Sequence, residues 1–341
     1  MGLPTISPLY TAEAPAIINH VSIICFDIKR GDHKMTAMQR TKKPSLSNIK
    51  EQWPLYIMVI PGIVFLIAFR YIPLMGSIIA FKDYSVTKGF IDSSWVGFKH
   101  FNRLLTYQGF HRVFTNTIIL GFLMTIVTFP IPILLAFMLN EIRMKKLKKF
   151  IQTSLYIPHF LSWVIIAGLT FDILGIGGLF NIIRQALGYD YILIMQKESY
   201  YRLVYVLTSI WKNSGWGTII YLAAISAIDP QLYEAAEIEG ATRIDQIRYI
   251  TFFSILPTII TVFLLGIGNF LELGFDQAFN LLTPMTYSVG DIIDTYVYRT
   301  GIQRAQYSFT TAVGLFQSVI GFFLVFIFNK VANRYSDGGI W

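Results

Sequence analysis

Charge is scarce in this sequence of 341 residues: Asp, Glu, Lys and Arg make up 14% of it, whereas 54% of the residues are hydrophobic. An ordinary soluble domain carries about 25% charged residues, so this chain lacks the side chains that cover a surface in water. It also has a single cysteine, Cys25, which leaves no disulfide to hold a small scaffold together. These absences exclude a soluble enzyme, a disordered chain and a disulfide-rich domain, and they indicate a protein that lies largely in lipid.

The sequence has no Gly-Lys pair either, and a P-loop needs that pair, followed by Ser or Thr, to hold the phosphates of ATP. Its five histidines show no HExxH spacing, and one cysteine is too few for a thiolate metal site. We therefore expect a chain that is not an enzyme and binds no cofactor. Any ATP and Mg²⁺ chemistry is expected on a separate ATPase subunit.

Long apolar runs are what the sequence does contain. A membrane-spanning helix needs about 20 predominantly apolar residues. Six segments reach this length: residues 54–81, 113–139, 155–174, 203–228, 255–273 and 305–329. Arg70 interrupts the first, and Lys212 is the one charge in the fourth. We predict an all-α integral membrane protein with six transmembrane helices over residues 53–341, preceded by a basic extension over residues 1–52.

Basic residues gather over residues 29–50 and 143–149. No aromatic residues interleave them to stack on bases, and both clusters flank apolar runs, so a membrane explains them better than nucleic acid. Loops on the N-terminal side of the six spans carry more Lys and Arg than the loops on the other side. Because basic loops stay in the cytoplasm, we predict that the extension and both termini are cytoplasmic.

The loop between the fourth and fifth spans differs in composition from everything around it. It holds five of the chain's 20 acidic residues: Asp229, Glu234, Glu237, Glu239 and Asp245. Asp229 followed by Pro230 is typical of a helix start, and Gly240 of a helix end in a left-handed turn. Thr242 with Asp245 three residues later matches a capping box that opens a second helix. The sequence thus predicts a helix–glycine–helix unit in the cytoplasm.

Two interpretations of this loop, residues 229–254, stay open. Charge alone favours a solvated connection between two spans. Small side chains at Ala235 and Ala236 allow another surface to approach closely, and the acids suit a basic groove on a partner. Together with the paired caps, these features favour a docking element.

A longer pattern in this loop resembles a known family. Glu234-Ala235-Ala236, three further residues, Gly240 and then nine residues to Ile250 are similar to the signature of the integral membrane subunits of bacterial binding-protein-dependent ABC importers. Further segments resemble the carbohydrate class of these permeases, the maltose type that carries oligosaccharides: residues 158–163, 211–225, 291–299, 312–316 and 318–321. The resemblance covers about residues 50–341.

The resemblance implies the type I importer permease fold in a bacterial cell membrane. It implies that Glu234, Ala235, Ala236 and Gly240 couple the chain to the ATPase. The implied partners are a sibling permease in a heterodimer, two cytoplasmic ATPase subunits, an extracellular solute-binding protein, an oligosaccharide and the lipid bilayer, with no nucleic acid. Transport would proceed by alternating access. The chain has Phe252-Phe253 where the family usually has Leu-Pro, which predicts that the second loop helix continues unbroken into the fifth span.

Polar residues in the fourth and fifth spans are candidates for a solute pathway, because such residues in a membrane usually face a cavity or another helix. The six candidates are Trp211, Asn213, Trp216, Tyr221, Asn269 and Glu272. Spacings of three, four and four residues predict that Asn269, Glu272, Asp276 and Asn280 share one helical face. Asp276 and Asn280 could instead lie in external water.

Neighbouring residues have a structural alternative. Gly215 and Gly217 permit close helix contact, and Lys212 either pairs with Glu272 or faces an acidic solute. Lys212, Arg299 and Arg304 together suggest an acidic, pectin-type oligosaccharide. The segment over residues 288–301 is expected to be a helix at the external mouth, or one that only packs there.

Two other functions remain. One is the same permease architecture with a non-sugar solute. The other is an ion-coupled secondary transporter, which the sequence disfavours because that class usually has internal repeats and none is evident here.

Overall fold

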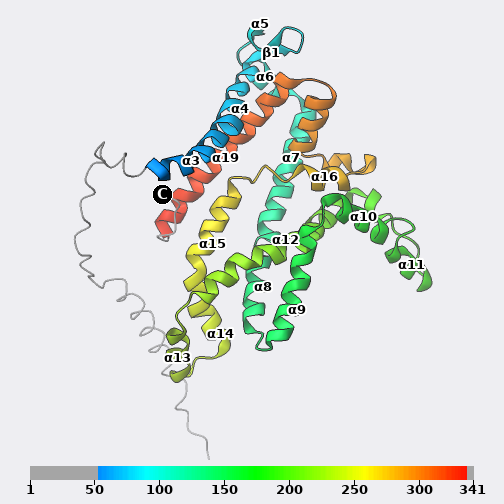
Figure 1. The fold of residues 1–341 in the computed structure, drawn as a ribbon. Coiled ribbons are helices and arrows are strands. Elements are labelled where there is room, and N and C mark those ends of the chain that lie inside the picture. The colour runs from blue at the N-terminus through cyan, green and yellow to red at the C-terminus, as the bar shows by residue number, and fades with distance from the viewer. Residues whose placement is uncertain (1–52, 336–341) are drawn as a thin grey trace, which may run out of the picture. The chain divides into compact units, whose positions relative to one another are not determined.

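The computed structural model describes residues 53–335, and its regular structure is almost entirely helical (Figure 1). The chain divides into two units, Met1–Tyr71 and Ile72–Trp341. The described part of the first unit consists of α3 (Trp53–Leu66) and η1 (Ile67–Tyr71), neither of which buries a residue. The predicted extension over residues 1–52 lies outside the described residues.

Five helical segments of the described chain are long and apolar enough to cross a membrane: Trp53–Phe81, Gln108–Glu141, Trp163–Ala186, Arg243–Ile267 and Tyr307–Asn333. They correspond to five of the six predicted spans. Arg70 does not end the first of them, because the helical conformation continues past it. The prediction of an all-α membrane protein is confirmed.

The predicted fourth span is helix α12 (Glu198–Ser226), which is 29 residues long but less apolar than the other five. Lys212, Asn213 and Ser214 in its middle lower its hydropathy. The helix lies inside the second unit and packs against α8 (Pro130–Glu141), α9 (Lys145–Tyr156) and the helices described below. Lys212 and Ser214 are buried inside the second unit, where other helices can supply partners for polar groups, so α12 tolerates these residues.

The third span begins later than predicted. Helix α9 is followed by η4 (Ile157–Phe160), and the chain then breaks before α10 (Trp163–Leu174). Ser162 starts α10, because its hydroxyl accepts a hydrogen bond from the Ile165 N–H at 3.3 Å. The apolar run continues into α11 (Leu179–Ala186).

The fifth span is continuous with the loop helix, as predicted from Phe252-Phe253. The helical conformation runs without a break from α14 (Arg243–Asp245) through η6 (Gln246–Thr251) to α15 (Phe252–Ile267). The far end of this span differs from the prediction, because α15 ends at Ile267 and the chain is not helical again until α16 (Phe275–Leu281). Asn269, Glu272, Asp276 and Asn280 therefore do not share one helical face, and that prediction is wrong.

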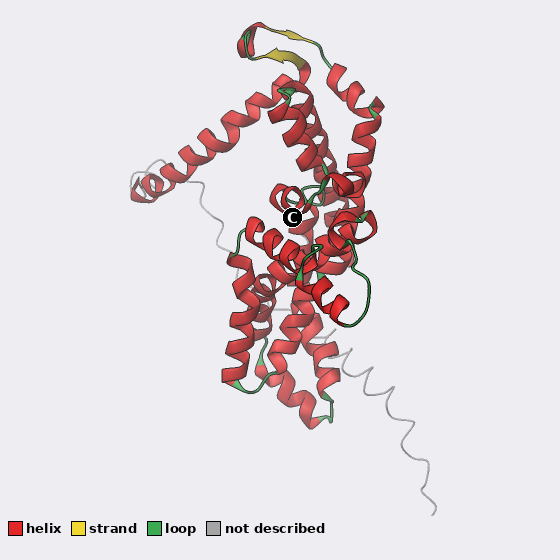
Figure 2. Cartoon of the chain, turned by 90° about the vertical axis from the view of Figure 1, so that its right-hand side faces the viewer, coloured by secondary structure: helices red, strands yellow, loops and turns green. Residues whose placement is uncertain are grey.

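The remaining elements belong to the second unit, one end of which carries a β-hairpin. A hairpin of β1 (Lys82–Ser85) and β2 (Ser93–Trp95), joined through α5 (Gly89–Asp92), lies at that end (Figure 2). The other elements are α4 (Ile72–Met75), η2 (Gly76–Phe81), α6 (Lys99–Thr106), α7 (Gln108–Leu123), η3 (Met124–Thr128), η5 (Ile194–Gln196), η7 (Pro284–Thr286), α17 (Tyr287–Gly290), α18 (Ile293–Val297), η8 (Tyr298–Gln303) and α19 (Tyr307–Tyr335). Instead of the one helix expected over residues 288–301, the chain forms α17, α18 and η8. Buried residues of α18 pack in one apolar cluster with α6, α7 and α19.

Gly215 gives a testable consequence of the packing of α12 against α9. A Cβ atom at this position would lie 2.1 Å from the backbone oxygen of Leu155, so the two helices would have to move apart. We expect Gly215→Ala to destabilise the protein by about 1–3 kcal/mol, the usual cost of overpacking. The midpoint of thermal unfolding of the purified protein measures this. Gly168→Ala is the control, because its Cβ would meet nothing within 4 Å; equal midpoints for the two variants would contradict the close packing.

Candidate functional site

The loop between α12 and α15 has the helix–glycine–helix structure that the sequence predicts. Helix α13 (Pro230–Ile238) starts where the Asp229 carboxylate accepts a hydrogen bond from the Gln231 N–H at 2.9 Å. It ends before Gly240, whose φ of 81° is left-handed. The Thr242 hydroxyl and the Asp245 carboxylate form the predicted capping box of α14.

Helix α13 buries none of its residues. Glu234 and Ala235 are exposed, Ala236 is half-buried, and the Ile238 side chain is 88% exposed. An ion pair of 2.9 Å between Glu237 and Arg243 links α13 to α14. The helix lies at the end of the second unit opposite the hairpin (Figure 1). It thus presents an acidic and apolar surface that the described part of this chain leaves uncovered.

A pocket of about 350 Å³ lies among α7, η3, α12, α15 and the non-helical segment 268–274. Three of the six predicted pathway residues line it: Asn213, Asn269 and Glu272. Aromatic rings of Phe129 and Phe270 form part of its wall. The structure therefore brings amide and carboxylate groups together with apolar surface in one place.

The other three predicted pathway residues lie elsewhere. Tyr221 is 2% exposed and packs in the apolar core between α8, α12 and α15. Trp211 and Trp216 are about half exposed and do not line this pocket. The Trp216 ring stacks on His159 with 4.7 Å between ring centroids.

Lys212 does not pair with Glu272, which corrects one sequence-based alternative. Its Nζ donates hydrogen bonds to two backbone oxygens, of His159 at 2.8 Å and of Leu161. These carbonyls lie at the break between α9 and α10, where helical partners for them are missing. Lys212 is largely buried and stabilises this break, and its side chain does not line the pocket.

Segment 268–274 forms part of the pocket wall with non-helical backbone, which the helical spacing of its polar residues did not predict. Its backbone oxygens find partners on other helices: Leu271 O accepts from Gln317 Nε2 at 2.8 Å, and Leu273 O accepts from the Tyr205 hydroxyl at 3.0 Å. Non-helical backbone in a membrane protein is tolerated where it is buried in protein or lines a cavity. The sequence feature that indicates this non-helical segment is Gly274, which ends it with a φ of 90°.

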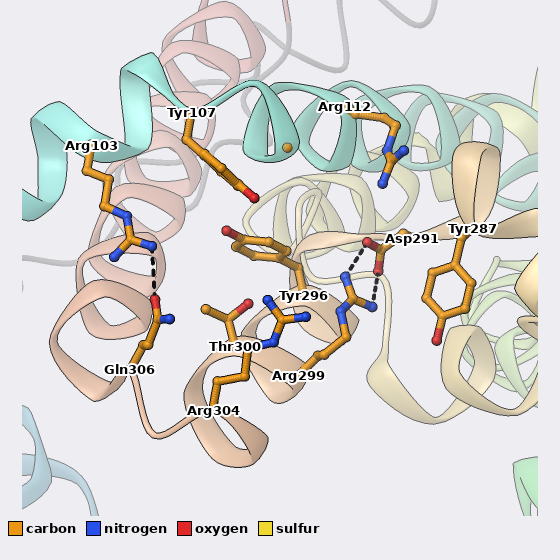
Figure 3. A pocket seen from close by; sticks show the side chains of 11 residues that line it. Arg103, Tyr107, Arg112, Tyr287, Asp291, Tyr296, Arg299, Thr300, Arg304 and Gln306 are labelled. Carbon is orange, nitrogen blue, oxygen red and sulfur yellow. Dashed lines mark hydrogen bonds and ion pairs between the residues drawn. The ribbon is translucent and has the colours of Figure 1, made fainter.

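Arg299 and Arg304, which the sequence analysis associated with an acidic solute, lie in a second pocket of about 320 Å³ (Figure 3). Arg103 and Arg112 lie there too, contributed by α6 and α7. Sequence reasoning missed these two because almost 200 residues separate them from η8. Burial disfavours the charge of Arg299, but hydrogen bonds and attraction to Asp291 outweigh that cost and raise the pKa of its guanidinium.

The chain is similar to known transport proteins over most of its length. Residues 109–337 match the family described as the binding-protein-dependent transport system inner membrane component. The chain is 44% identical to the polygalacturonan/rhamnogalacturonan transport system permease protein YteP of Bacillus subtilis, over 88% of this chain and 94% of that protein. It is 41% identical to protein LplB of the same organism, over 86% of this chain and 92% of that protein.

Among solved structures, the chain resembles one from a bacterial ABC transporter that imports the acidic polysaccharide alginate. The TM-score is 0.79 at 39% identity, covering 84% of this chain and 98% of that one. A structure of bacterial alginate ABC transporter with an alginate pentasaccharide-bound periplasmic protein matches with the same TM-score at 38% identity, covering 86% of this chain and 99% of that one. The chain therefore belongs to the family of binding-protein-dependent transport system inner membrane components, and it is a multi-pass, non-enzymatic permease of an ABC importer.

Proposed function

We propose that this permease imports acidic oligosaccharides of the pectin type by ATP-driven alternating access. The observation that carries the proposal is the 44% identity over 88% of the chain to a permease named for polygalacturonan and rhamnogalacturonan. The resemblance to an importer of alginate, another acidic polysaccharide, supports the same class of solute.

The central pocket, lined by Asn213, Asn269 and Glu272, is the proposed passage for the sugar. A sugar ring has hydroxyl groups at its edges and apolar C–H faces. Amide and carboxylate groups in the pocket supply hydrogen bonds to the former, and Phe129 and Phe270 supply surface for the latter.

Helix α13 is the proposed contact with the ATPase. Its exposed Glu234 and Ala235, with half-buried Ala236, suit close insertion into a basic groove. We propose that α13 and both termini lie in the cytoplasm and the hairpin outside, an orientation that the basic segment 143–149 supports. The complete transporter would contain a sibling permease, two ATPase subunits that hold ATP and Mg²⁺, and an extracellular binding protein. The alginate complex with its periplasmic protein supports the last of these.

Purification of the tagged chain from its native membrane tests this assembly. We expect a second permease and two copies of an ATPase to co-purify, identified by mass spectrometry and by ATP hydrolysis. Solute uptake by the chain alone, driven by an ion gradient without an ATPase, would contradict the proposal.

Single substitutions test the central pocket. We expect Asn213→Ala and Glu272→Gln each to lower the rate of uptake about threefold to tenfold, because each removes a hydrogen-bonding group from the path. Uptake of labelled oligogalacturonide into proteoliposomes that contain the complete transporter measures this. Trp211→Phe is the matched control, since Trp211 belongs to the same helix but does not line the pocket. Wild-type rates in both pocket variants would remove these residues from the path.

A further inference from the structure

The second pocket holds more positive charge than this chain neutralises. Four arginines line it, with Asp291 as the one acidic residue among the lining side chains. Asp291 is already paired, because its two carboxylate oxygens accept from Arg299 at 2.6 and 3.2 Å. Arg103, Arg112 and Arg304 have no carboxylate partner among residues 53–335.

The unpaired arginines point toward the same space. Figure 3 shows Arg112 reaching into the pocket from α7 and Arg304 reaching in from the opposite wall, next to η8. Arg103 is held at the edge, where its guanidinium donates to Gln306 Oε1 at 3.0 Å and lies 4.4 Å from the centre of the Phe309 ring. Like charges placed together repel, so this arrangement is stabilised when an anion enters.

Tyrosine side chains form the rest of the recognition surface. Tyr107, Tyr287 and Tyr296 line the pocket, and their rings offer apolar faces while their hydroxyls both donate and accept. A volume of about 320 Å³ lies at the lower end of the range for small-ligand pockets, roughly 300–1,000 Å³. The pocket is thus concave, basic and partly aromatic, and a ligand with carboxylates on a ring that has both polar edges and apolar faces fits it.

We propose that this pocket is a carboxylate-binding subsite in which Arg112 and Arg304 hold the uronate groups of an acidic oligosaccharide. The planar guanidinium group donates two parallel hydrogen bonds to a carboxylate, which makes arginine suited to this recognition. The pocket lies between α6, α7, α17, α18 and η8, at the end of the unit opposite α13. The subsite therefore meets the sugar on the outer side, before the central pocket. This inference rests on the proposed function.

An acidic surface of the extracellular binding protein is the other carboxylate source that reaches this end. The concave shape and the tyrosines favour a sugar, because a protein surface needs neither ring faces nor a pocket of this size. The experiment below separates the two sources by measuring docking of the binding protein without its sugar.

The test uses the complete transporter in proteoliposomes, with its binding protein and a trimer of galacturonic acid as the probe. Arg304→Gln and the double variant Arg112→Gln/Arg304→Gln remove charge from the pocket, Arg304→Lys keeps it, and Lys88→Gln removes an exposed charge at the hairpin of the same end. We expect trimer uptake to fall tenfold or more in Arg304→Gln and in the double variant. This is the loss that follows from one missing charged hydrogen bond. We expect Arg304→Lys to retain an intermediate rate and Lys88→Gln to match the wild type. Docking of the sugar-free binding protein should be unchanged in all of them.

Uptake by Arg304→Gln and the double variant at the wild-type rate would overturn the subsite while leaving the importer intact. If the arginine variants weaken docking of the sugar-free binding protein as much as they weaken trimer uptake, the pocket binds a surface of that protein instead of the sugar. A wild-type transporter that imports no acidic trimer would overturn the proposed function itself. The yield of assembled complex and its basal ATP hydrolysis show whether each variant folds, and exposed Arg304 makes no hydrogen bond or ion pair that its replacement would break within the described residues.

Discussion

Replacing Gly240 with valine is expected to lower coupled sugar uptake more than tenfold. Gly240 ends α13 with a φ of 81°, where its N–H donates to Glu237 O at 3.1 Å and the next N–H, of Ala241, donates to Ala236 O at 2.9 Å. A side chain in this conformation costs about 1–2 kcal/mol, and a β-branched one fits it worst. The turn will therefore open, and the surface of α13 that we propose contacts the ATPase will lose its position. Uptake and ATP hydrolysis by the reconstituted transporter, measured together, report the loss of coupling.

A matched control is available at Gly188. Its φ is 79°, and a Cβ there, as at Gly240, would meet nothing within 4 Å. Gly188→Val thus imposes the same backbone cost after α11, away from α13, and should leave coupling intact. Ala235→Arg tests the surface without altering the turn, because it adds bulk and charge to an exposed helical position; it should also uncouple. Normal uptake per ATP in both Gly240→Val and Ala235→Arg would contradict the role of α13.

Asp291→Ala is expected to destabilise the protein by about 3–5 kcal/mol, the cost of removing one partner from a buried ion pair. The Asp291 side chain is 1% exposed and accepts from Arg299 and, at 2.8 Å, from the Thr295 hydroxyl. Its loss leaves the Arg299 guanidinium, 26% exposed, without its counter-charge beside three other arginines. The midpoint of thermal unfolding of the purified transporter measures the effect.

A double-mutant cycle separates the ion pair from packing. Arg299→Gln alone should also destabilise, because it leaves the Asp291 carboxylate buried and unpaired. The double variant Asp291→Ala/Arg299→Gln should be more stable than the sum of the two single losses predicts. Strictly additive losses would show that the two side chains do not act as a pair.

Much of the fold follows from the sequence. The apolar runs predict helices close to those found over Trp53–Phe81, Gln108–Glu141 and Tyr307–Asn333. The caps at Asp229 and Thr242 and the turn at Gly240 are local, so a short stretch of sequence contains all that determines them. The same holds for the unbroken helix through Phe252, since no proline or glycine interrupts it there.

The rest depends on contacts between distant residues. The end of α15 at Ile267 requires Gln317 and Tyr205 to satisfy the backbone oxygens of the segment that follows, and periodicity along one helix cannot reveal partners on two others. Lys212 binds backbone oxygens 51 and 53 residues away rather than Glu272. The second pocket is formed by α6 and α7 together with η8. The spacing of residues in the sequence therefore could not reveal that Arg103 and Arg112 lie beside Arg299 and Arg304.

ATP-driven import of acidic oligosaccharides is the function that we propose for this permease. The most direct test is uptake of labelled oligogalacturonides and of their fully methyl-esterified forms by proteoliposomes with the complete transporter, with and without ATP. We expect ATP-dependent accumulation of the acidic form and little uptake of the neutral ester. Equal uptake of both forms, or accumulation without ATP, would contradict the proposed function.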